Sequence, residues 1–326
     1  MRKCLSVLLC ALLLLSLWGC KFTAKPALGL VHSAATSAYT NRMEEGFRTA
    51  AEALGYDCIS VTPSDDSVDA QIVLIENLIE QGVKGIAISG NQTQGLESAL
   101  QKVKDAGIRI VSLDRDTAGS QLFINPVDME LVGAALMNAV LDLCTDEGSF
   151  AVISHIVAGN DPWVSCMKAL HMNDKYARLS WAETSYCNEL TQVEDSVKQL
   201  LEQYPDLEVI CCTDSEALLV CAKAVEALGA SVKVTGLGVP SQMQDYVGEE
   251  KVCPYFFLWN PYEIGNCAAY ALEALVGGAA LKEGGSLATK LSQYEIFYGN
   301  PSEFMIMIGP PFCFTSAELA IDENIY

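Results

Sequence analysis

The chain has 326 residues, is 51% hydrophobic and carries a formal net charge of −21. This length favours two lobes over one small core, and the hydrophobic fraction is too high for a disordered chain. A surface this acidic repels phosphate backbones, which excludes nucleic acid as an expected partner.

The first twenty residues predict export. A positively charged start precedes an apolar run over 5–18, and Cys20 directly follows a glycine. This order is typical of a secretory signal, and the run is short for a bilayer span, which needs about 20 residues. The Gly-Cys pair resembles a bacterial lipobox, whose cysteine takes a diacylglyceryl group; an uncleaved anchor helix is the alternative. We expect a signal peptide over 1–19, a lipid-anchored linker over 20–26 and a folded part outside the cytoplasmic membrane.

The chain that follows alternates apolar, β-branched runs with helical patterns that end at glycines. The predicted strands lie at 27–32, 57–62, 85–89, 108–113 and 121–125, and the predicted helices at 41–54, 68–81 and 94–106. Strands that alternate with helices indicate parallel βαβ units. We therefore expect a doubly wound sheet with helices on both faces.

The same pattern then restarts. The predicted helices of this half lie at 128–143, 163–172, 190–203, 216–228 and 261–276, and the predicted strands at 149–154, 177–183, 207–212, 232–237 and 252–259. The predicted fold class is therefore α/β, with two doubly wound parallel-sheet lobes.

The polypeptide chain is expected to cross between the two lobes three times. The first lobe is predicted to hold 27–126 plus 262–292, and the second 127–261 plus 293–326. The expected crossings form a hinge and lie near Asn125-Pro126, near Asn260-Pro261 and within 284–291. A ligand held in the cleft between the lobes would favour their closure.

Polar residues follow several of the predicted strands. Asp114 and Arg115 come directly after the strand at 108–113, and Thr213 follows the strand at 207–212. Ligands of open α/β sheets bind beyond the carboxyl ends of the strands. A carboxylate accepts from neighbouring hydroxyls and a guanidinium donates to others, so an Asp-Arg pair there suits a polyhydroxylated ligand. The alternative is a surface turn with a weak salt bridge.

Three segments carry a family resemblance: 110–116, 213–218 and Phe257-Leu258-Trp259-Asn260 before the last long helix. In this order and spacing they resemble the type I periplasmic sugar-binding proteins of ABC importers. The resemblance covers about 27–326 and is closest to the branch of the autoinducer-2 receptor and the rhamnose-type proteins. It implies a periplasmic-binding-protein type I fold that captures a small sugar or polyol and presents it to an ABC permease.

The resemblance also implies the ligand contacts. They are Asp114, Arg115, Asn160, Thr213, Ser215, Asn260, Tyr39, Ser33 and Trp259. Two departures from the family pattern argue against individual ligands. Ser33 stands where the autoinducer-2 receptor has a lysine, and the aspartate that ribose binders carry after the strand ending near Gly238 is missing.

Other chemistry is not expected. Thirteen cysteines and three histidines include no CxxC pair, so we predict neither metal nor cofactor, and buried free thiols are the expected state of most cysteines. No nucleophile–base pair indicates an enzyme. A monomer attached to the membrane only through the Cys20 lipid is expected. The alternative function is a sugar or autoinducer-2 sensor for a membrane kinase or chemoreceptor.

Overall fold

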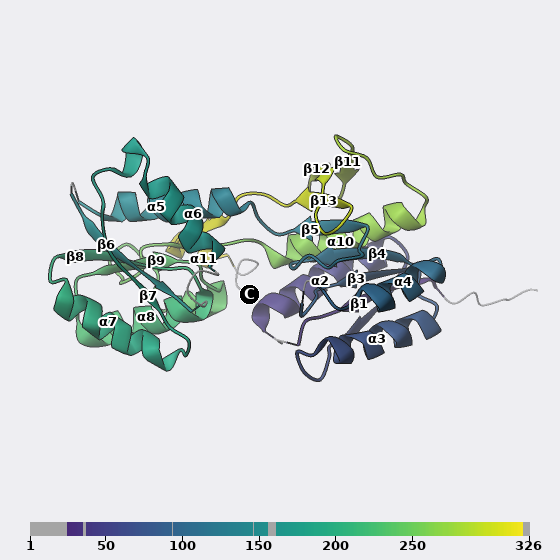
Figure 1. Ribbon diagram of the computed structural model, residues 1–326, viewed down its shortest axis with the longest axis horizontal. Helices are drawn as coiled ribbons and strands as arrows, with labels where there is room; N and C mark the ends of the chain where they lie inside the picture. The colour runs from purple at the N-terminus through teal and green to yellow at the C-terminus, as the bar shows by residue number, and fades with distance from the viewer. Residues whose placement is uncertain (1–24, 35–36, 93, 146, 156–160, 322–326) are drawn as a thin grey trace, which may run out of the picture.

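The computed structural model describes residues 25–34, 37–92, 94–145, 147–155 and 161–321. They form two α/β lobes that lie side by side and are joined by crossing segments (Figure 1). The predicted signal peptide, the predicted lipid-anchor residue Cys20 and the predicted contact Asn160 lie outside these residues.

The first lobe is built on an eight-stranded sheet in the order β11-β12-β13-β5-β4-β3-β1-β2. Its strands are β1 (Ala27–Val31), β2 (Asp57–Val61), β3 (Gly85–Ile88), β4 (Arg109–Leu113), β5 (Leu122–Asn125), β11 (Ser286–Ala288), β12 (Gln293–Tyr298) and β13 (Phe304–Met307). Pairing is parallel from β13 through β5 to β2, and antiparallel among β11, β12 and β13.

Helices cover both faces of this sheet. They are α2 (Ala38–Ala53) and α10 (Pro261–Val276) on one face, and α3 (Val68–Glu80) and α4 (Glu97–Asp105) on the other. Successive strand residues point to opposite faces. Leu30 therefore joins the core under α2 and α10, while its neighbour Val31 joins the core under α3 and α4.

Two glycines let α2 and α10 approach closely. A Cβ atom on Gly46 would lie 2.0 Å from the carbonyl oxygen of Tyr262, and one on Gly265 would lie 1.9 Å from that of Met43. Side chains at these positions would therefore push the helices apart. This contact holds the middle of α2 against the first turns of α10, and the two helices lie side by side in the first lobe (Figure 1).

The second lobe repeats the architecture on a smaller parallel sheet in the order β7-β6-β8-β9. Its strands are β6 (Ser149–Ser154), β7 (Ser180–Tyr186), β8 (Leu207–Cys212) and β9 (Lys233–Gly236), and the antiparallel pair β10 (Phe256–Leu258) and β14 (Phe312–Phe314) adjoins β9. One face carries α5 (Met129–Leu143) and α6 (Pro162–His171), and the other carries α7 (Thr191–Gln203) and α8 (Ser215–Leu228) (Figure 1).

Short elements complete the lobe: the 3-10 turn η1 (Asp174–Tyr176), α9 (Pro240–Met243) and α11 (Ser316–Leu319). The predicted fold class of two doubly wound parallel-sheet lobes is confirmed.

The predicted position of the third crossing is wrong. Residues 293–307 were expected in the second lobe, but β12 and β13 extend the first sheet, and the chain crosses between β13 and β14. The physical reason is burial: Tyr294 and Ile296 of β12 alternate into the core under α2 and α10, and β13 pairs with β5. Only the segment from β14 onward packs in the second lobe.

All ten cysteines of the described residues are free thiols, and seven of them are buried. Cys58 and Cys166 are half-buried, and Cys313 is exposed. Within the same residues, no cluster of three His, Cys, Asp or Glu side chains could hold a metal ion. None of the described helices combines the length and apolar character that a membrane crossing needs.

Candidate ligand-binding cleft

A cavity of about 380 Å³ lies between the lobes. The first lobe contributes Ser37, Tyr39 and Asp114, and the crossing segment contributes Leu258 and Trp259. The second lobe contributes Trp163, Thr213, Asp214, Ser215, Glu216, Leu237, Val239 and Gln242. The structure thus brings five of the predicted contacts to one cavity: Asp114, Tyr39, Thr213, Ser215 and Trp259.

Asp114 stands at the carboxyl end of β4 and is held by a relay of hydrogen bonds. The Tyr39 hydroxyl donates to Asp114 Oδ1 over 2.5 Å, and Trp259 Nε1 donates to the Tyr39 hydroxyl over 2.7 Å. The relay joins α2, β4 and the crossing segment before α10. It orients one carboxylate oxygen and leaves the carboxylate able to accept from ligand hydroxyls.

Burial raises the pKa of Asp114, and the Tyr39 hydrogen bond and the Arg115 charge oppose that shift only in part. The carboxylate is therefore only partly solvated in the unliganded protein. A ligand hydroxyl that donates to Asp114 supplies the hydrogen bonding that water supplies to an exposed carboxylate. Burying Asp114 costs free energy on folding, and ligand binding recovers part of that cost.

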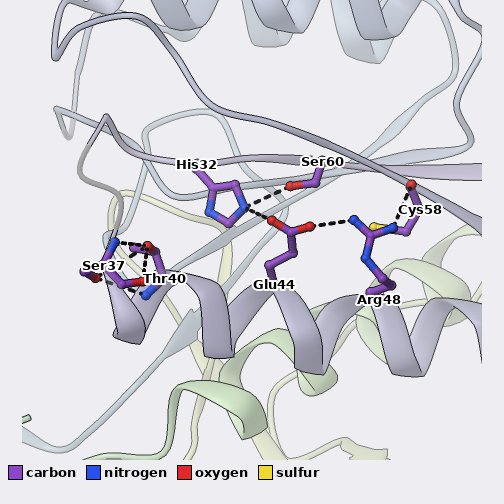
Figure 2. A network of polar contacts seen from close by, with 7 residues as sticks. All are labelled: His32, Ser37, Thr40, Glu44, Arg48, Cys58 and Ser60. Atoms are coloured by element: carbon purple, nitrogen blue, oxygen red, sulfur yellow. Dashed lines mark hydrogen bonds and ion pairs between the residues drawn. The ribbon is translucent and has the colours of Figure 1, made fainter. Parts of the chain in front are cut away.

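The start of α2 positions Tyr39. Ser37 and Thr40 form a reciprocal capping box, in which the Ser37 side chain accepts from the Thr40 N–H and the Thr40 side chain accepts from the Ser37 N–H (Figure 2). Such a cap satisfies two backbone donors at a helix start. It fixes the first turn, and with it the direction of Tyr39.

A polar network anchors α2 to the sheet one turn further along. His32 Nε2 lies 3.1 Å from Glu44 Oε2 and 3.0 Å from Ser60 Oγ, and Arg48 donates to Glu44 Oε1 over 2.5 Å (Figure 2). Arg48 also reaches the carbonyl oxygen of Cys58. The network ties the end of β1 to β2 and α2, beneath the loop that begins at Ser33.

Asp161 organises the second-lobe side of the cleft and was missed in the sequence. It is 2% exposed, and its Oδ2 accepts from Thr213 Oγ1 over 2.5 Å and from Ser154 Oγ over 2.6 Å. Its Oδ1 accepts from the backbone N–H of Trp163 and Val164 and so caps α6. The Asp-Pro pair ahead of a helix was the available signal.

Two indole rings line the cavity. The Trp163 and Trp259 ring centroids lie 6.1 Å apart at an interplanar angle of 46°. Trp163 was not among the ligand contacts predicted from the sequence. Aromatic faces of this kind pack against the apolar C–H face of a sugar while polar side chains meet its hydroxyls.

A second cavity of about 570 Å³ shares Asp114 with the first and lies within the first lobe. Ser33 and Arg115 line this second cavity instead of the interlobe one. Arg115 NH1 donates to the carbonyl oxygen of Asn91 over 2.7 Å. Asn91 was not among the predicted contacts. Its side chain also accepts from the Ala34 N–H, so this residue connects the loops after β1, β3 and β4.

Asn260 does not reach either cavity. Its Oδ1 accepts from the Tyr262 N–H and caps α10, and the exposed residue lines a separate cavity at the hinge. The family resemblance implied that it contacts the ligand together with Asp114. The N-cap role turns the Asn260 side chain back onto its own helix, which is the physical reason for the difference.

Comparison with known proteins shows which family the chain belongs to. The model of the periplasmic binding protein domain matches residues 28–280. The chain belongs to this family, and within it to the type I sugar solute-binding proteins of ABC transporters, as its resemblance indicated. Members of the family are substrate-binding proteins.

Three relatives illustrate the likeness. A solute-binding protein from Clostridium phytofermentas, solved with bound L-rhamnose, is 32% identical with a TM-score of 0.76, over 93% of this chain and 99% of that one. The ribose import binding protein of Bacillus subtilis is 21% identical over 89% and 99% of the two chains. The D-apiose import binding protein of Paraburkholderia graminis is 23% identical over 60% of this chain, which spans 64% of that protein's length.

Proposed function

We propose that this protein is an extracytoplasmic, lipid-anchored receptor that captures a small neutral sugar in the interlobe cleft and presents it to an ABC importer. The observation that carries the proposal is the cleft itself: Asp114 from one lobe and Thr213 from the other line the same cavity. A ligand touching both lobes binds the closed form better than the open form and so drives closure.

The charge of the cleft narrows the ligand class. Its acidic lining residues are Asp114, Asp214 and Glu216, and the described residues that line it include no lysine or arginine. Within this cavity, the anionic group of a sugar acid or sugar phosphate would meet only like charge in a partly desolvated site, since Arg115 lines the neighbouring cavity. Uncharged sugars are therefore the favoured class.

The aromatic walls favour a sugar with an extended apolar face. Trp163, Trp259 and Tyr39 line the same cavity as the carboxylates. A deoxysugar replaces a hydroxyl with a methyl or hydrogen, which such walls accommodate without an unpaired polar group. The relative solved with L-rhamnose supports this class, so a deoxyhexose is the first probe and pentoses are the second.

Attachment through Cys20 is part of the proposal and rests on the sequence of the leader. The contacts predicted for Ser33, Arg115 and Asn160 are also part of the proposal. Ser33 and Arg115 line the cavity that shares Asp114 with the cleft, which supports their contact with a part of the ligand that extends past Asp114. The alternative, a sensor that delivers its ligand to a membrane kinase or chemoreceptor, would use the same cleft.

A thermal-shift screen tests the function. L-rhamnose, other deoxyhexoses, pentoses and autoinducer-2 are added in turn to the protein, and one class should raise the melting temperature because it binds only the folded form. At a concentration of 100 times Kd, the stabilisation should be about 2.7 kcal/mol. Absence of a stabiliser among all these sugars would contradict the proposal.

Asp114→Asn probes the site directly. The change keeps the side-chain shape and removes the charge, so affinity for the stabilising sugar should fall about 10- to 100-fold, corresponding to loss of about 1.5–3 kcal/mol of charge-assisted hydrogen bonding. The unliganded variant should remain folded, because the replaced carboxylate is only partly solvated. Asp105→Asn, an exposed aspartate at the end of α4, is the matched control and should leave affinity unchanged.

A further inference from the structure

A third cavity, of about 340 Å³, lies at the hinge and has no part in the function proposed above. All three crossing segments line it: Pro126 follows β5, Asn260 follows β10, and Ile308 to Pro310 follow β13. Rotation of one lobe against the other must be absorbed by backbone changes in such segments. The cavity therefore has different shapes in the open and closed forms.

The lining of this hinge cavity is aromatic and carries one charge. Trp259, Phe312 and Phe314 contribute rings, and Glu263 is the one ionisable side chain among the described residues that line it. Phe312 is 47% exposed although it lies in a strand. Aromatic rings around a carboxylate match an organic cation with an apolar body, through cation–π contact and charge pairing.

Glu263 is already oriented. The Tyr294 hydroxyl of β12 donates to Glu263 Oε1, and Glu263 lies in the first turn of α10, where a carboxylate is favoured. A ligand ammonium would therefore meet a carboxylate whose position is fixed before binding. The net charge of −21 adds a long-range attraction for cations and none for anions.

Trp259 connects the hinge cavity to the cleft. Trp259 lines both cavities, and its Nε1–H donates to the Tyr39 hydroxyl, which in turn donates to Asp114. A molecule packed against the hinge side of the ring would therefore act on the hydrogen-bond relay that orients the Asp114 carboxylate. This shared wall gives the two sites a physical route for coupling.

We propose that the hinge cavity is a second binding site, for a small primary amine carried on an aromatic or branched apolar body, and that its occupancy changes the affinity of the cleft for sugar. The coupling half of this proposal rests on the proposed function, whereas the binding half does not. By linkage, the sugar must change the affinity for the amine by the same factor.

Benzylamine is the probe for the binding half, with benzyl alcohol and benzoate as its uncharged and anionic counterparts. Ligand-observed NMR on the whole protein, without sugar, should give binding in the order amine, alcohol, benzoate. Glu263→Gln should weaken the amine about tenfold and leave the alcohol unchanged. Glu273→Gln is the matched control, because it removes the same charge from the same helix about 15 Å further along.

Two results would overturn the binding half: no amine binding at millimolar concentration, or equal binding to the wild type and the Glu263→Gln variant. The coupling half is measured as the sugar Kd with and without saturating benzylamine, and an unchanged Kd would overturn it. If no sugar binds at all, the proposed function has failed and the coupling needs another readout. That readout is the radius of gyration of the protein with benzylamine alone. An unchanged radius of gyration would then overturn the coupling half of the proposal.

Discussion

Asp114 has a backbone conformation that few residues adopt. Its φ is 64°, and among the described residues it is the one non-glycine with a positive φ. Aspartate and asparagine are the non-glycine residues that tolerate this left-handed region best. The conformation turns the side chain at the end of β4 toward Tyr39. Backbone strain of this kind gathers at ligand sites, which agrees with the role proposed for this carboxylate.

His32 makes stability depend on pH. Burial lowers its pKa, and the attraction of Glu44 offsets that shift only in part. The folded protein therefore keeps the ring neutral, whereas the unfolded chain takes up a proton below about pH 6.5. Stability should be complete above that pH and should fall below it, by up to about 1.4 kcal/mol per pH unit. Urea unfolding at about pH 7.5 and about pH 5.5 measures the difference.

Glu44 titrates below the pH range of that measurement and does not affect it. Burial would raise its pKa, but hydrogen bonds from Arg48 and Ser60 and the nearby His32 bring the pKa below its usual value. Its contribution is present above about pH 4.5 and is lost only at lower pH. His32→Gln should reduce the pH slope, because it removes the group whose pKa burial lowers. Equal slopes in the wild type and the His32→Gln variant would contradict this account.

Among the elements, α3 holds the strand ends that form the floor of the first-lobe cavity. Gln71 is completely buried, and its Nε2 donates to the carbonyl oxygens of His32 and Ser89 over 2.8 and 2.9 Å. Its Oε1 accepts from the Asn91 N–H over 2.9 Å. One side chain thus joins the ends of β1 and β3 just before Ser33 and Asn91 enter the cavity.

Gln71→Leu should destabilise the protein by about 3 kcal/mol, because buried backbone groups that lose a partner cost about 1–3 kcal/mol each. Sugar affinity should also fall, since the loops after β1 and β3 lose their common support. Chemical denaturation and calorimetric titration measure the two effects. Gln81→Leu, on the exposed end of the same helix, should change stability by less than about 0.5 kcal/mol. A variant at residue 71 as stable as this control would show the network to be dispensable.

At the scale of the whole molecule, closure is the measurable consequence of two lobes that share a cavity. The stabilising sugar should reduce the radius of gyration in small-angle scattering toward the about 19 Å of a compact chain of about 300 residues. The Asp114→Asn variant at the same sugar concentration should keep the open value. A radius that stays constant while sugar binds would contradict hinge closure and leave only a static site.

The sequence by itself determined the two α/β halves and most of the elements within them. The strand predicted at 207–212 and the helix predicted at 128–143 agree with β8 and α5 within one residue, because buried β-branched runs and amphipathic helices carry their own periodicity. Asp114 was found by the rule that ligands meet the ends of parallel strands, since that rule depends on topology alone.

Only the tertiary structure decided which strand ends meet. Strands β12 and β13 join the first sheet because their alternate residues fill its core, a fact that short local patterns do not carry. Asn260 follows a strand as Asp114 does, yet its side chain caps α10 instead of entering the cleft. Asp161 was missed in the sequence, because it becomes a partner of Thr213 only when the start of α6 and the end of β8 come together. Periodicity is local, whereas a binding site is set by long-range contacts between side chains.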